Sequence, residues 1–186
     1  MVDRAYGDGR YLVEIVPNLG KAGNNAYILS GPSRGKVTII DAPEGAEAIL
    51  EAVGRRTIER IVITHESDEN LAGIAALRKA TDAPVYAGVE NAKTGTVRQL
   101  KHGETFDIGG ATARILHTPG QTPGSYSFHF GGSVLTGNTL ADSAAADANQ
   151  KKESIKTHLL QLQPDTVVLP AQGAATTVAK LAEAQK

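Results

Sequence analysis

The sequence predicts an α/β (α+β) fold in which two strand-rich halves are each flanked by helices. In the first half, short apolar runs alternate with segments whose apolar residues recur at helical spacing. In the second half, glycine pairs at 109–110 and 131–132 separate short runs and mark hairpin turns. Because the apolar face of each sheet must be covered, this order favours sheets stacked face to face with helices outside.

The first half is expected to begin with three strands, which two turn-forming clusters separate. Further along, Ala46, Ile49 and Val53 recur at helical spacing, so a helix follows the third strand. The expected elements, in order, are strands at 11–16, 25–29 and 36–41, a helix at 44–53, a strand at 61–64, a helix at 70–79 and a strand at 84–87.

The second half is expected to follow a loop at residues 91–101. Its helix is indicated by Ile155, Leu159 and Leu162, which lie at positions i, i+4 and i+7. The expected elements, in order, are strands at 106–108, 111–116, 125–130 and 133–135, a helix at 149–161, a strand at 166–169 and a C-terminal helix.

Size and composition restrict the classes of protein. With 186 residues and 19.4 kDa, we expect a single domain over 1–186. A formal net charge of -1 gives no basic excess for nucleic acid, and the lack of cysteine excludes disulfides and thiolate metal sites. Residues 1–7 have no apolar signal region, and no run approaches the ~20 apolar residues of a membrane helix. We therefore expect a soluble, cytoplasmic protein without nucleic-acid or membrane partners.

Four segments carry the motifs on which a functional prediction depends. They are THESDENLAG at 64–73, HTPGQTPGS at 117–125, TGNTL at 136–140 and LPAQG at 169–173. In this order, they resemble the signature segments of the metallo-beta-lactamase superfamily, in particular small glyoxalase-II-like hydrolases. The resemblance implies a four-layer αββα sandwich and a site between the sheets that holds one or two zinc ions in the family.

The resemblance also implies seven metal-ligand positions, and most of them carry other residues here. His65 is retained, and Glu69 keeps a carboxylate where the family has aspartate. Neutral amides are poor replacements for imidazole and carboxylate ligands of zinc. We therefore expect no metal and no cofactor, and a polar pocket formed by the seven positions, which are His65, Ser67, Glu69, Asn70, Gln121, Asn138 and Gln172.

Three functions are compatible with this pattern. The leading hypothesis is a hydrolase scaffold that has lost its zinc centre and is inactive as a zinc hydrolase. The second is a re-tasked or residual hydrolase of thioesters, lactones or esters, in which His65 and Glu69 are catalytic, with Glu66 or Asp68 assisting, and with or without one weakly held metal. The third is a scaffold that binds a small molecule or cofactor. The glycines and prolines of the motifs are intact, which favours a pocket emptied by selection or engineering over random drift.

Simpler structural roles are also expected for several of these residues. Ser67 or Asp68 is placed to cap a helix, and acidic residues such as Glu69 are favoured in its first turn. Asp41, at the end of a strand, is expected to bind loop backbone, and Lys21 lies in a loop that could reach the pocket mouth. His102, His129 and His158 are expected to be ordinary surface or half-buried residues. The oligomeric state is not predicted.

Overall fold

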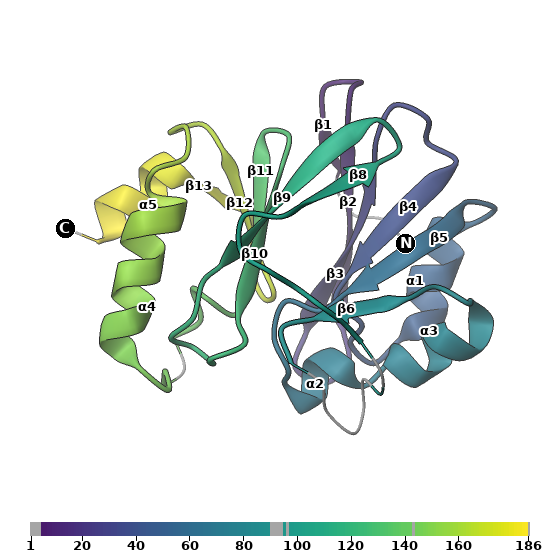
Figure 1. Cartoon of the computed structure of the whole chain (residues 1–186), viewed down its shortest axis with the longest axis horizontal. Coiled ribbons are helices and arrows are strands. Elements are labelled where there is room, and N and C mark those ends of the chain that lie inside the picture. The colour runs from purple at the N-terminus through teal and green to yellow at the C-terminus, as the bar shows by residue number, and fades with distance from the viewer. Residues whose placement is uncertain (1–4, 90–94, 96, 143, 186) are drawn as a thin grey trace.

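Two sheets lie face to face, and helices cover the outer face of each sheet (Figure 1). The computed structural model of the chain describes residues 5–89, 95, 97–142 and 144–185. One sheet has seven strands and the other has six. The predicted four-layer αββα arrangement is confirmed.

The seven-stranded sheet is built from the first half of the chain, in the order β1-β2-β3-β4-β5-β6-β7. Pairing is antiparallel from β1 to β4 and parallel from β4 to β7. The strands are β1 (Ala5–Gly7), β2 (Leu12–Leu19), β3 (Asn24–Ser30), β4 (Lys36–Ile40), β5 (Thr57–Val62), β6 (Val85–Ala87) and β7 (Arg98–Gln99). The helices are α1 (Ala46–Val53), α2 (Asp68–Leu71) and α3 (Ile74–Ala80).

The six-stranded sheet is built from the second half, in the order β13-β12-β11-β10-β9-β8. Only β11 and β12 pair in parallel in this sheet, among the residues that the structure describes. The strands are β8 (Thr105–Ile108), β9 (Ala111–His117), β10 (Tyr126–Phe130), β11 (Ser133–Gly137), β12 (Val167–Pro170) and β13 (Thr176–Thr177). The helices are α4 (Ala148–Ser154), a π-helical turn (Ile155–Leu159) and α5 (Val178–Ala184).

Three apolar cores hold the four layers together. One lies between the seven-stranded sheet and helices α1 and α3, and a second lies between the six-stranded sheet and the helices at its outer face. The third is shared by the two sheets and includes Phe128 and Phe130. Strand β3 shows why the sheets stack, because all seven of its residues are buried. Its Ile28 faces the helix side and its Leu29 faces the other sheet.

Most predicted elements are present, but several boundaries were wrong. The strand expected at 11–16 continues to Leu19, into the first of the two turn-forming clusters expected between strands, with a register shift between Val16 and Leu19. The strand expected at 61–64 begins at Thr57 and ends at Val62. Both misjudged stretches mix polar and apolar residues, so strand pairing decides their structure. Leu19 pairs with Asn24 across a short turn, and Thr57 pairs with Lys36 of β4.

The helix expected at 70–79 is instead two helices, α2 and α3. The backbone between them pairs with the segment after β4: Ala42 N donates to Asn70 O at 3.3 Å, and Gly73 N donates to Ala42 O at 2.8 Å. The helix expected at 149–161 changes to a π-helical turn after α4, where Leu160 N donates to Ile155 O. Of the loop expected at 91–101, residues 91–94 and 96 lie outside the described residues, and β7 occupies two others.

The two halves are joined directly where the motif segments meet. Tyr126 N donates to Thr64 O at 2.8 Å, and Asn25 N donates to Ala171 O at 2.7 Å. Gly137 lies against Thr64 so closely that a first side-chain carbon at position 137 would be 2.3 Å from Thr64 Oγ1. These contacts bring the four motif segments to one edge of the sandwich. Within the described part of the chain, no helix is long and apolar enough to span a membrane.

Candidate functional site

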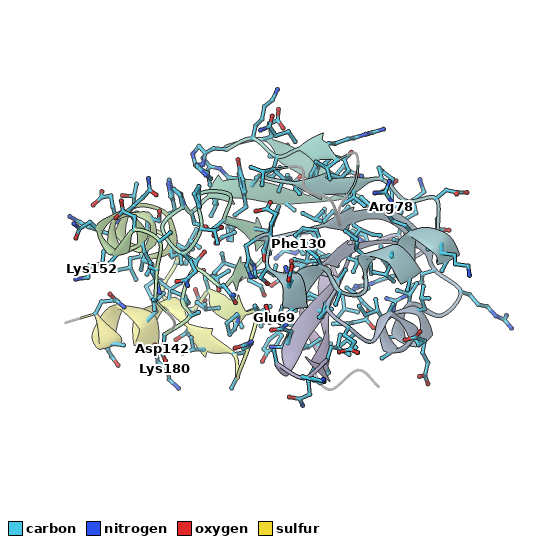
Figure 2. The ribbon with its side chains drawn as sticks, turned by 90° about the horizontal axis from the view of Figure 1, so that it is seen from below. Glu69, Arg78, Phe130, Asp142, Lys152 and Lys180 are labelled. Atoms are coloured by element: carbon cyan, nitrogen blue, oxygen red, sulfur yellow. The ribbon has the colours of Figure 1, made fainter. Side chains whose placement is uncertain are left out.

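A pocket of about 550 Å³ opens where the two halves meet, and three of the seven predicted positions line it. They are Glu69 from α2, Asn138 after β11 and Gln172 after β12. Asp142 adds a second carboxylate from the half with the six-stranded sheet, opposite Glu69 (Figure 2). Ser67, His65, Asn70 and Gln121 are not part of this lining. The structure therefore brings together only part of the predicted set.

A second hollow of about 480 Å³ adjoins this pocket, because Ala22 and Glu69 line both. Its lining adds Lys21, Glu44 and Asp68, so Lys21 lines the adjoining hollow and not the first pocket. Carboxylates outnumber the single lysine around these two hollows. An uncharged or cationic ligand is therefore favoured over an anionic one.

His65 is buried outside the pocket lining and is held by a chain of hydrogen bonds that starts at Asp41. Thr64 Oγ1 donates to Asp41 Oδ2 at 2.8 Å, and the ring nitrogen Nδ1 of His65 lies 3.0 Å from Thr64 Oγ1. Because the Thr64 hydroxyl gives its one proton to Asp41, it can only accept from His65. Nδ1 therefore carries the proton, and Nε2 presents a lone pair.

Burial fixes the charge state of this array. His65 is 2% exposed, and desolvation lowers its pKa from 6.5 to about 4, so the ring is neutral at pH 7. Burial also raises the pKa of Asp41 to about 6, against three hydrogen bonds that favour its charged form. Asp41 is thus still a carboxylate at neutral pH and acts as an acceptor. The expected structural role of Asp41 agrees with these contacts.

Asn70 lies in the same buried array. Its Nδ2 donates to Asp41 Oδ1 at 2.7 Å and to His65 O at 3.1 Å. Both protons of the amide are therefore used, and its Oδ1 has no partner among the residues that the structure describes. His65 Nε2 is also buried and lacks a partner in the described part of the chain. The array thus leaves two acceptors that only a donor such as water or a ligand N–H would satisfy.

Ser67 and Glu66 have local roles. Ser67 is the N-cap of α2, and its Oγ accepts a hydrogen bond from Asn70 N at 3.2 Å. This confirms one of the two caps expected from the sequence. Glu66 turns toward β6 instead of the pocket, since its Oε1 accepts from Val89 N. The structure therefore does not place Glu66 beside Glu69 as a catalytic helper.

Gln121 is held by a lysine that the sequence gave no reason to select. Lys151 Nζ, from α4, donates to Gln121 Oε1 at 3.0 Å and also to Ala141 O. Gln121 Nε2 in turn donates to Ala144 O at 3.2 Å. This amide is therefore occupied on both sides by protein groups.

The two amides that line the pocket are those of Gln172 and Asn138. Gln172 Nε2 donates to Asn24 Oδ1 at 2.9 Å, which ties the segment after β12 to β3. Asn138 is half-buried, and its backbone carbonyl accepts from Ala141 N. As expected, His102, His129 and His158 are exposed or half-buried. Asp142 and Lys151 were missed because neither lies in a motif, and only their position in the fold brings them to the site.

The match to a family model decides where this chain belongs. The model of the metallo-beta-lactamase superfamily matches residues 19–169. The chain belongs to this superfamily. The two stacked sheets, the helices outside them and the meeting of the four motif segments at one edge are the features that this membership explains.

Relatives within the metallo-beta-lactamase superfamily include hydrolases and metal-bound proteins. The hydroxyacylglutathione hydrolase of Hyphomonas neptunium is 34% identical over 110 residues, which are 58% of this chain and 43% of that protein. The chain thus spans less than half the length of that relative. The structure of TTHA1623 in a di-iron-bound form is 27% identical with a TM-score of 0.72, covering 89% of this chain and 96% of that chain.

The fold is also similar to that of BLEG-1 B3 metallo-beta-lactamase. That structure has a TM-score of 0.79 at 23% identity and covers 92% of this chain and 96% of that chain. The likeness extends over nearly the full length of both proteins, so the architecture of this superfamily member is conserved although its motif residues differ from those the family's zinc site requires.

The side chains of this metallo-beta-lactamase-fold protein do not fit a zinc or di-iron centre. His65 is the one imidazole among the seven positions, and Gln121 Oε1 already accepts from an ammonium group. Zinc sites use three or four imidazole, thiolate or carboxylate ligands. Within the described residues, no group of three or more histidine, aspartate and glutamate side chains is arranged to hold a metal ion.

Proposed function

We propose that this superfamily member has lost the zinc centre of its hydrolase relatives and binds a small molecule in a metal-free polar pocket. The observation that carries this proposal is the chemistry of the side chains at the seven positions where the family has metal ligands. His65, the one imidazole of the seven positions, is buried, and Glu69, the one carboxylate, is exposed in the pocket. The other five positions carry four amides and one hydroxyl. Without a metal, nothing lowers the pKa of a bound water from 15.7 toward about 7, as zinc hydrolysis requires.

The metal content of the purified protein tests the proposal. We expect less than about one tenth of an equivalent of zinc or iron after equilibration with the metal and removal of the excess, measured by inductively coupled plasma mass spectrometry. The matched control is a variant with Ser67→His, Glu69→Asp, Asn70→His, Gln121→His, Asn138→Asp and Gln172→His. One or two equivalents held tightly by the unmodified protein would contradict the loss of the zinc centre.

Binding is tested by thermal shift with a panel of uncharged, cationic and anionic small molecules. A ligand of the pocket should raise the melting temperature of the unmodified protein, and Asn138→Leu, which removes a polar group of the lining, should abolish the shift. An equal shift in both proteins would show that binding occurs elsewhere.

A second candidate is a residual hydrolase, and the orientation of His65 favours it. The chain from Asp41 through Thr64 leaves the Nε2 lone pair free, as a general base requires. Burial of His65 opposes it, since the substrate must reach that nitrogen. Assays with thioesters, including an acylglutathione, decide between the two. Turnover that His65→Gln abolishes and Glu69→Gln reduces would establish the hydrolase instead.

A further inference from the structure

Lys151 lies at the contact between α4 and the loop at 118–124. The backbones meet closely at Gly120, where a first side-chain carbon would lie 2.2 Å from Lys151 N. Gly120 has a φ of 126°, a conformation that side chains rarely adopt. Asp147, the N-cap of α4, donates its N–H to Gly120 O at 2.9 Å. The loop therefore rests directly on the beginning of α4, and the Lys151 side chain extends from this contact.

The ammonium group of Lys151 joins two segments through oxygen atoms. It donates to Gln121 Oε1 at 3.0 Å and to Ala141 O, and the side chain is half-buried. None of the ion pairs between residues that the structure describes includes Lys151. The hydrogen-bond acceptors that the described residues offer to this ammonium group are thus carbonyl-type oxygens, the kind of atom that also binds a metal cation.

The two acceptors connect the pocket wall to a neighbouring motif loop. Ala141 lines the pocket itself, whereas Gln121 lies in the motif loop at 118–124, which is outside the lining. Further hydrogen bonds join the same loop to the segment that precedes α4, and we call this contact the seam. Ala146 N donates to Gln121 O, and Gln121 Nε2 donates to Ala144 O. Lys151 is the charged member of this seam.

We propose that Lys151 is a built-in cation that fastens the loop at 118–124 to the pocket wall, and that lysine and a metal ion are alternative partners of residue 121. A metal ion and an ammonium group both seek electron-rich atoms, so they compete for one side chain and repel each other. The second part rests on the proposed function, since it takes the unmodified site to be metal-free. In this proposal, the charge of Lys151 opposes metal binding in addition to the loss of the ligand residues.

The fastening is tested by hydrogen exchange in Lys151→Met. The amide protons of Ala146 and Asp147, which donate across the seam, are expected to exchange at least about tenfold faster than in the unmodified protein. The matched control is Lys152→Met on the same helix, because Lys152 is exposed and points outward (Figure 2). Equal exchange in the two variants would overturn the fastening role. Amides of β3 serve as an internal reference for global opening.

The competition is tested in the variant that restores all six ligand residues. Its affinity for zinc, measured by calorimetry, is expected to rise about 100-fold when Lys151→Met is added, whereas adding Lys152→Met leaves it unchanged. Equal affinity with and without Lys151→Met, including no binding in either, overturns the competition. Tight zinc binding by the unmodified protein would instead refute the proposed function, and the exchange comparison would still report on Lys151.

Discussion

At the scale of single residues, the buried array around Asp41 links two ionisable groups whose pKa values move in opposite directions. The pKa of His65 falls to about 4 and that of Asp41 rises to about 6, and burial is the largest cause of both shifts. From about pH 4 to 6, the folded protein holds a proton on Asp41 and none on His65. The unfolded chain holds a proton on His65 and none on Asp41. Because both states bind the same number of protons, the free energy of unfolding changes little with pH in this range.

Asp41→Asn should expose the contribution of His65. With the aspartate gone, the unfolded state binds more protons than the folded state between about pH 4 and 6.5, so the free energy of unfolding should rise by about 3 kcal/mol over that range. Urea unfolding at several pH values measures this slope. Adding His65→Gln should remove it, and a flat profile in Asp41→Asn alone would contradict the assigned charge states.

At the scale of elements, the end of β11 shows how a strand of one sheet is fitted to a loop of the other. Gly137 combines a φ of 51° with an approach to Thr64 that leaves no room for a side chain. The sequence motif at 136–140 contains Gly137, but its contact partner, Thr64, lies 73 residues earlier in the chain. Only the fold reveals why the position must stay small.

Gly137→Ala should lower the free energy of unfolding by about 2 kcal/mol more than a glycine substitution that adds only backbone strain. Gly103→Ala is the matched control, because Gly103 has a φ of 82° and nothing within 4 Å of the added carbon. Its cost should be about 1 kcal/mol. Chemical denaturation of the two variants gives both values, and equal costs would show that the contact with Thr64 relaxes freely.

The elements also show what sequence patterns can and cannot predict. The helix α1 and the turns at 109–110 and 131–132 were predicted because their signals are local: apolar spacing and glycine pairs. The strands β1, β7 and β13 were missed, since two or three residues carry no periodicity. The motifs located the candidate site, but the contact between Lys151 and Gln121 depends on how α4 packs, which no local pattern encodes.

At the scale of the whole molecule, the core between the sheets makes each sheet depend on the other. Phe128 is fully buried in this core, together with Leu29 from β3 and Ile40 from β4. Hydrogen bonds between the halves, such as that from Tyr126 N to Thr64 O, join the same layers at the site edge. We therefore expect the two sheets to lose their structure together.

Phe128→Ala should lower the free energy of unfolding by about 3–5 kcal/mol through the cavity it leaves between the sheets. Far-UV circular dichroism and tyrosine fluorescence should still report one coincident urea transition. Val89→Ala is the control: Val89 is 46% exposed, and its loss should change the stability by less than about 0.5 kcal/mol. Two separate transitions would show that the halves unfold independently.

Strand β3, enclosed on both faces, has a consequence for how this protein would be followed during folding. Water reaches its peptide groups only when an entire layer lifts away, so small local fluctuations leave them untouched. The exchange rate of deuterium into the amides of this strand would therefore report how often the whole molecule opens. Exchange rates of segments at the pocket rim could then be compared with that rate to separate local opening from global opening.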